Sequence, residues 1–154
     1  RSGWGSPLEQ GVGRGIAIVE SFGTIVAEVI EASMGADGRP KVHNVFAAVD
    51  CGTTVNPLNG AAQIEGGIIM GLSATIGEAI TLDKGAVVQG NFNDYPILKL
   101  AESPASIDVH FIESDAPLGG LGEPGVPPSA PALANALFAV TGKRIRTLPI
   151  VANT

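Results

Sequence analysis

A glutamate in a glycine-rich segment is the strongest candidate for chemistry in this sequence. Glu123 lies in the segment Gly119–Gly125, which reads Gly-Gly-Leu-Gly-Glu-Pro-Gly and has few side chains to shield its backbone. The segment leads into the most apolar predicted helix. A carboxylate packed there would lose solvation, and its pKa would rise toward the range that a general base needs. The alternative is an ordinary solvated loop acid, and the composition of the segment does not decide between the two.

A glutamine on a glycine-rich helix is the second candidate. Gln63, Gly67 and Gly71 are spaced i, i+4 and i+8, so they share one face of a predicted helix, and Gly66 lies beside them. Each glycine costs a helix roughly 1 kcal/mol relative to alanine, so such a face indicates that something approaches the backbone closely. Either another segment of the chain packs there, or a polar ligand binds there and accepts hydrogen bonds from the Gln63 amide.

Three other features give weaker indications. The segment Gly11–Gly15 has the glycines of a nucleotide-binding loop, but no strand precedes it and no helix follows, so a flexible entry into the first strand is favoured. Cys51 is the single cysteine, which excludes an internal disulfide and a cysteine-based zinc cluster. His43 and His110 fall within predicted strands. A small buried thiol and two half-buried histidines are favoured over a Cys–His nucleophile pair.

Composition limits the class of protein. The 154 residues carry a net charge of −6, which argues against a nucleic-acid binder. The hydrophobic fraction of 45% allows a sizeable core, and residues 1–154 are predicted to form a single domain. No apolar run reaches the ~18 residues that a membrane span needs. The chain begins at Arg1 without a signal peptide, and we expect it to be part of a longer protein.

Runs of alternating or β-branched residues predict the strands. Within the second strand, Ile25, Ala27, Val29 and Glu31 are expected to share one face. The turn signal Asp37-Gly38 separates the second and third strands and predicts an antiparallel hairpin. The expected strands are Gly15–Val19, Thr24–Ala32, Lys41–Asp50 and Ile107–Ile112, with shorter ones at Val87–Val88 and Leu148–Val151.

Two helices are predicted from apolar spacings of three and four. The first covers Pro57–Ile80, with Asn56 as its N-cap and proline in its first position. The second covers Ala130–Thr141, with Ser129 as its N-cap and Gly142 after its end. The second helix is apolar nearly all round, so we expect it to be buried. Together these elements predict an α+β fold: a two-layer sandwich with a mixed or antiparallel sheet and two main helices.

Five segments in order along the chain resemble one known family. They are Gly13–Ala17, Val49–Gly52 with Asn56-Pro57, Gln63–Gly67 with Met70-Gly71, Gly90–Tyr95, and Gly119–Gly125 with Pro131–Asn135. Taken together they resemble the carboxy-terminal part of the molybdenum-cofactor subunit of the xanthine dehydrogenase and aldehyde oxidase family. The resemblance is strongest to the bacterial branch of the isoquinoline 1-oxidoreductase β-subunit.

This resemblance implies a reaction class and a set of site residues. Such enzymes hydroxylate an N-heterocycle or an aldehyde with oxygen from water, using a molybdopterin-type molybdenum cofactor. Glu123 matches the glutamate that acts as general base, and Gln63 matches the glutamine beside the cofactor. Gly66, Gly67 and Gly122 are the further cofactor contacts implied. The pterin holds the metal in this family, so the resemblance implies no direct protein ligand to it.

The resemblance also implies partners. They are the upstream part of the same large subunit, an iron–sulfur small subunit with [2Fe–2S] clusters, and a small aromatic heterocycle or aldehyde as substrate, in the bacterial cytoplasm or periplasm. A [2Fe–2S] cluster needs four ligands, so Cys51 alone cannot hold one. The chain alone is therefore expected to bind no molybdenum and show no turnover. The alternative is a non-catalytic binding or assembly domain with the same fold, which would have no need of Glu123.

Overall fold

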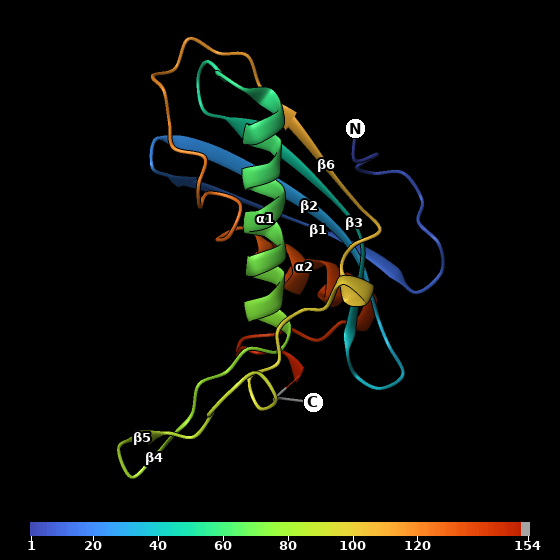
Figure 1. The fold of residues 1–154 in the computed structure, drawn as a ribbon. Coiled ribbons are helices and arrows are strands. Elements are labelled where there is room, and N and C mark those ends of the chain that lie inside the picture. The colour runs from blue at the N-terminus through green and yellow to red at the C-terminus, as the bar shows by residue number, and fades with distance from the viewer. Residues whose placement is uncertain (152–154) are drawn as a thin grey trace.

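A four-stranded sheet forms one layer of the domain and two helices form the other (Figure 1). The computed structural model describes residues 1–151. The sheet has the order β1-β2-β3-β6, in which the first three strands are antiparallel and β6 is parallel to β3. The prediction of a two-layer α+β fold with a mixed sheet is confirmed. The strands are β1 (Val12–Ser21), β2 (Thr24–Met34), β3 (Pro40–Asp50) and β6 (Ser106–Phe111).

Tight turns fix the register of the first three strands. Phe22 and Gly23, between β1 and β2, both have positive φ angles, of 53° and 73°. Such angles at both central residues give the twist that an antiparallel hairpin needs. The predicted hairpin at Asp37-Gly38 is confirmed: β2 and β3 are antiparallel, and the Gly35 N–H donates to the Arg39 carbonyl at 2.8 Å.

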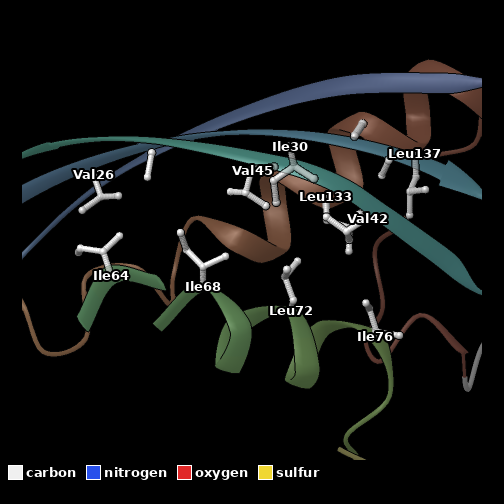
Figure 2. Close-up of a cluster of buried hydrophobic side chains, with 14 of the residues drawn as sticks. Val26, Ile30, Val42, Val45, Ile64, Ile68, Leu72, Ile76, Leu133 and Leu137 are labelled. Atoms are coloured by element: carbon white, nitrogen blue, oxygen red, sulfur yellow. The ribbon is translucent and has the colours of Figure 1, made fainter. Parts of the chain in front are cut away.

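The core lies between the sheet and both helices, α1 (Pro57–Ile76) and α2 (Ser129–Thr141). Figure 2 shows one side of α1 pointing at the sheet through Ile64, Ile68 and Leu72, which follow the predicted spacing of four. Helix α2 packs against β1 and β2. Gly13 and Gly15 lie directly against its backbone, since a Cβ on Gly15 would overlap the Ala132 carbonyl oxygen. The first glycine segment is therefore a strand packed against a helix.

The helix boundaries differ from the prediction in two places. Asn56 caps α1 as expected, because its Oδ1 accepts from the Asn59 N–H at 3.0 Å. However, α1 ends at Ile76 and not at Ile80. Gly77 leaves the helical region, and its N–H closes the last turn on the Ser73 carbonyl at 3.1 Å. Ser129 is the first residue of α2 and not its N-cap, because its hydroxyl contacts Glu28 and the Gly125 carbonyl instead.

Two further predictions are wrong in detail. Residues 148–150 form bends, and Leu148–Val151 contains no strand, because the Ile150 N–H donates to the Thr75 carbonyl of α1 at 2.9 Å while its side chain enters the core. Helix α2 is buried on one side only, through Ala132, Leu133, Ala136 and Leu137, whereas Pro131 and Ala139 are exposed. The prediction that α2 is buried all round, made from its apolar composition, is therefore wrong, because its other apolar side chains lie outside the core of this chain.

The remaining elements are short. The strands β4 (Leu82–Asp83) and β5 (Ala86–Val87) form a hairpin that projects from the body of the domain, and η1 (Leu100–Glu102) precedes β6 (Figure 1). The predicted short strand at Val87–Val88 lies one residue earlier. The face shared by Ile25, Ala27 and Val29 is the side of the sheet away from the helices. Among residues 1–151, no helix is both long and apolar enough to cross a membrane.

One carboxyl group lies inside the core. Glu28 of β2 is fully buried on the helix side of the sheet, between Val26 and Ile30 in the sequence. The Ser129 hydroxyl is 3.0 Å from its Oε2, while Oε1 has no hydrogen-bond partner among the described residues. Burial raises the pKa of Glu28 to about 8, against a smaller lowering by the Ser129 hydrogen bond. The carboxyl group is therefore neutral in the folded protein at neutral pH.

This buried acid predicts a pH-dependent stability. In the unfolded chain Glu28 titrates near 4.5, so between about pH 4.5 and 8 unfolding releases a proton. The contribution of neutral Glu28 to stability is complete below that range and is lost as pH rises through it, by up to ~1.4 kcal/mol per pH unit. We expect Glu28→Gln, which stays neutral, to remove this slope. Urea unfolding across the range measures it, and an unchanged slope in the variant would contradict the assignment.

Two glycines of α1 predict opposite effects of alanine. A Cβ on Gly71 would lie 2.7 Å from the Val126 carbonyl oxygen, whereas a Cβ on Gly66 would meet nothing within 4 Å. Gly66→Ala is expected to stabilise the chain by roughly 0.5–1 kcal/mol through helix propensity. Gly71→Ala is expected to destabilise it by roughly 1–3 kcal/mol, because overpacking outweighs that gain. Thermal unfolding of both variants checks this, and equal midpoints would mean that α1 and the Val126 segment are not in contact.

Candidate functional site

The segment between β6 and α2 passes over the start of α1 and then runs down beside that helix (Figure 1). Its first anchor is the turn between β1 and β2. The Gly120 N–H donates to the Phe22 carbonyl at 2.9 Å, and the Thr24 hydroxyl donates to the Gly120 carbonyl at 2.7 Å. A Cβ on Gly119 would lie 2.5 Å from the Gly23 carbonyl oxygen, so only glycine permits this approach.

The second anchor is the backbone of α1. A Cβ on Gly125 would lie 2.7 Å from the Ile64 carbonyl oxygen, and a Cβ on Gly67 would lie 3.3 Å from the Gly125 Cα. The two glycines face each other, and this contact lets the segment rest directly on the helix. Of the two interpretations of the glycine face, close packing by another segment of the chain accounts for Gly67 and Gly71.

Residues 121–124, which we call the bridge, connect the two anchors and include the candidate acid Glu123. Leu121 packs beside Gly60 of α1, and Pro124 is buried. Gly122 and Glu123 are exposed, and the Glu123 carbonyl accepts from the Val126 N–H at 2.9 Å. The backbone of Glu123 is thus fixed on both sides while its side chain faces outward. The sequence predicted that this carboxylate would be desolvated. In the structure the described residues leave it exposed to solvent.

Gln63 lines a groove next to this bridge. The groove has a volume of about 360 Å³ and lies between the start of α1 and residues 118–121. Gln63 and Gly66 are both exposed and are neighbours on the helix surface, three residues apart. Gly125 contacts Ile64, Gln63 is one residue before Ile64, and Glu123 is two residues before Gly125. Since consecutive Cα atoms are 3.8 Å apart, the Cα atoms of Gln63 and Glu123 lie within roughly 16 Å of each other. The lining residues are Cys51, Thr53, Thr54, Val55, Asn56, Asn59, Gly60, Gln63, Leu118, Gly119 and Leu121.

Other motif residues hold the site in place. Asp50 Oδ1 accepts from the Gly52 N–H at 3.2 Å and from the Ser114 hydroxyl at 2.6 Å, which ties the end of β3 to the segment after β6. Asn135 donates to the Ile16 carbonyl at 3.1 Å and ties α2 to β1. Cys51 is buried with its Sγ 3.5 Å from the Thr54 hydroxyl. These contacts give structural reasons for the Val49–Gly52 and Pro131–Asn135 motifs.

Several residues that shape the site were not predicted from the sequence, namely Thr24, Ser114 and the pair formed by Glu28 and Ser129. For Glu28 a signal existed: strand alternation puts it on the same face as Val26 and Ile30, which is an unusual position for a carboxylate. The two histidines differ: His43 is half-buried as expected, with its Nε2 2.8 Å from the Ser33 hydroxyl, whereas His110 is exposed and not half-buried. Within residues 1–151, no group of three or more His, Cys, Asp or Glu side chains is placed to hold a metal ion.

Comparison with known proteins agrees with this architecture. Residues 10–104 match the family of molybdopterin cofactor-binding domains. The chain is 36% identical over 141 residues, 91% of its length, to the isoquinoline 1-oxidoreductase β-subunit of Brevundimonas diminuta. It is 38% identical over 75% of its length to a nicotinate dehydrogenase subunit of Pseudomonas putida. It covers only 18% and 10% of these two proteins, so it spans less than a fifth of the length of either relative.

The fold is also shared with solved structures. The crystal structure of quinoline 2-oxidoreductase from Pseudomonas putida 86 superposes on 82% of this chain with a TM-score of 0.71 and 27% identity, and the matched part is 17% of that chain. The aldehyde oxidoreductase of Desulfovibrio gigas also gives a TM-score of 0.71 at 23% identity. From the ordered motifs, the fold and the domain match, the chain belongs to the molybdopterin cofactor-binding domains, within the molybdenum-binding subunits of the xanthine dehydrogenase family.

Proposed function

We propose that this chain supplies the general base and part of the cofactor site of a molybdenum hydroxylase that oxidises an N-heterocycle or an aldehyde with water as oxygen source. The observation that carries the proposal is the doubly anchored bridge. It holds Glu123 outward between Gly119 and Gly125, beside the groove that Gln63 lines. A loop acid without a function would not need a backbone fixed on both sides of it.

The exposed groups fit an organic cofactor with hydrogen-bonding edges. The Gln63 amide both donates and accepts hydrogen bonds. Gly66 and Gly122 offer open backbone, since a Cβ on either would meet no other atom within 4 Å. A ligand resting there would reach the peptide groups directly. Gly67 contributes indirectly, because it lets Gly125 approach the helix and so brings the bridge close to Gln63.

Glu123 would act by taking a proton from the oxygen that attacks the substrate carbon. The molybdenum cofactor, when bound, supplies the redox centre that receives the two electrons of the oxidation. The anchored backbone keeps the carboxylate oriented, and Pro124 limits its movement. Its side chain is exposed in this chain. Cover from the cofactor and the rest of the enzyme would exclude water from around this carboxylate.

Exposed apolar residues around the groove support a larger partner surface. Val55 and Leu118, which line the groove, are 86% and 70% exposed, and Leu58, next to the lining residue Asn59, is 85% exposed. Exposed apolar side chains gathered around a groove are typical of interaction sites. We assign this cover to the upstream part of the same large subunit, which would complete the substrate pocket. An iron–sulfur small subunit with [2Fe–2S] clusters would then take up the electrons.

The role of Glu123 predicts a specific loss of turnover. Glu123→Gln keeps the shape of the side chain and its ability to form hydrogen bonds but cannot accept a proton at neutral pH. In the intact enzyme kcat is expected to fall by at least 10²–10⁴, the usual contribution of a general base, with molybdenum still bound. Steady-state kinetics and metal analysis on the same preparation measure both quantities.

Glu113→Gln is the matched control, because Glu113 is an exposed acid of the same segment before the first anchor. It is expected to leave kcat unchanged. A Glu123→Gln enzyme with full metal content and a near-parental kcat would show that Glu123 is only a loop acid.

The role of Gln63 predicts a loss of cofactor without a loss of fold. Gln63→Ala removes an exposed side chain and favours the helix, so the unfolding temperature should not fall. An unpaired polar atom on the cofactor would weaken its binding by roughly 1–3 kcal/mol, which lowers the molybdenum content after dialysis. Glu65→Ala, an exposed change on the same helix, is the control. If the molybdenum contents of Gln63→Ala and the parent enzyme are equal, Gln63 does not bind the cofactor as proposed.

A further inference from the structure

The buried acid Glu28 and the second anchor of the bridge meet at one hydroxyl group. Ser129 Oγ lies 3.0 Å from Glu28 Oε2 and 3.1 Å from the Gly125 carbonyl oxygen. Both Glu28 and Ser129 are fully buried. None of the ion pairs among the described residues includes Glu28. The contact therefore joins the interior of the sheet to the segment that carries Glu123.

Counting protons decides how these three groups bond. The Ser129 hydroxyl has one hydrogen, while an ionised carboxylate and a carbonyl both only accept. With Glu28 ionised, one of the two short contacts would be left without a hydrogen. With Glu28 protonated, its O–H donates to Ser129 Oγ, and the Ser129 hydroxyl donates to the Gly125 carbonyl. Burial of Glu28 without a cation favours this neutral form.

The chain is short between this contact and the proposed base. Gly125 lies two residues after Glu123, and the Val126 N–H closes a turn on the Glu123 carbonyl. The Ser129 N–H continues the series to the Val126 carbonyl at 3.4 Å. Gly71 of α1 presses on the same spot, because a Cβ there would lie 2.9 Å from Ser129 Oγ. A shift of the Ser129 hydroxyl would therefore change the position of the backbone at Gly125 and, through it, of the bridge.

We propose that Glu28 and Ser129 form a buried hydrogen-bond relay, from the Glu28 carboxylic acid through the Ser129 hydroxyl to the Gly125 carbonyl, that positions the bridge bearing Glu123. Glu28 and Ser129 are thus positioning residues, since neither touches substrate or cofactor in this assignment. The inference rests on the proposed function for its effect on turnover. Its effect on the bridge itself stands on the geometry alone.

Hydrogen exchange in the full-length protein tests the effect on the bridge. Amide exchange of Gly122, Glu123, Gly125 and Val126 is compared in the parent, Glu28→Gln, Glu28→Leu, Ser129→Ala and the double variant Glu28→Leu/Ser129→Ala, with the Val126 N–H, which bonds to the Glu123 carbonyl, as the main reporter. Glu28→Gln keeps a neutral donor toward Ser129 and should retain parental exchange. Ser129→Ala should accelerate it by roughly tenfold, as expected for the loss of one buried hydrogen bond. Adding Glu28→Leu to Ser129→Ala should accelerate it little further, because the relay is already broken.

Turnover and controls complete the test. In the loaded enzyme Ser129→Ala should lower kcat by about 10- to 100-fold at unchanged molybdenum content, because the base is misplaced, while Glu28→Gln should retain parental kcat. Glu31→Gln is the control: this acid lies on the same strand but pairs with Arg14 and Asn44, so bridge exchange should not change. If Glu28→Leu fails to fold, Ser129→Ala, which removes one oxygen atom, still decides the matter.

The possible failures are distinguishable. Parental exchange in Ser129→Ala, or additive effects in the double variant, would overturn the relay even if Glu123→Gln abolishes turnover. Accelerated bridge exchange together with an active Glu123→Gln enzyme would overturn the proposed base and leave the relay standing.

Discussion

The contact between the backbone of α1 and the backbone at Gly125 is the constraint on which the site depends. A Cβ on Gly125 would overlap the Ile64 carbonyl, and Gly67 leaves the space that Gly125 occupies. Two peptide backbones at this distance leave no room for side chains, so the position of the bridge follows from the position of the helix. The helix in turn is fixed by Ile64, Ile68 and Leu72 in the core. Core packing thus sets where Glu123 stands.

The buried contact between Glu28 and Ser129 also helps to fix the position of the bridge, and it lowers the stability of the core. Burying Glu28 disfavours its charged form, and its Oε1 has no partner among the described residues. An apolar residue at this position of β2 would fit the alternation with Val26 and Ile30 better. A strained or polar choice inside a core is expected where a nearby functional element must be held in one position. The link through Ser129 to Gly125 gives Glu28 such a reason.

The sequence predicted what depends on local pattern, and missed what depends on contacts between distant segments. Alternation, the Asp37-Gly38 turn and the Asn56 cap predicted the four strands of the main sheet and the start of α1. The end of α1 was placed too late because the apolar spacing continues past Ile76, while Gly77 already leaves the helix. Ser129 has the residue type of an N-cap, yet its hydroxyl is used across the core, 101 positions from Glu28. Patterns of neighbouring residues in the sequence cannot predict a hydrogen-bond partner that is so distant along the chain.

The glycines show how structure divides a motif that looks uniform in sequence. A Cβ on Gly71, Gly119 or Gly125 would lie less than 3.0 Å from backbone atoms of the same chain, so packing requires glycine there, and a Cβ on Gly67 would make a tight contact of 3.3 Å with the Gly125 Cα. Gly66 and Gly122 face open space, and packing gives them no reason to lack a side chain. In an exposed helix turn such as that of Gly66, alanine would be more stable. Glycine at an open position is therefore better explained by a ligand that must approach the backbone. By that argument the cofactor would rest on the surface between Gln63, Gly66 and Gly122, with Glu123 at its edge.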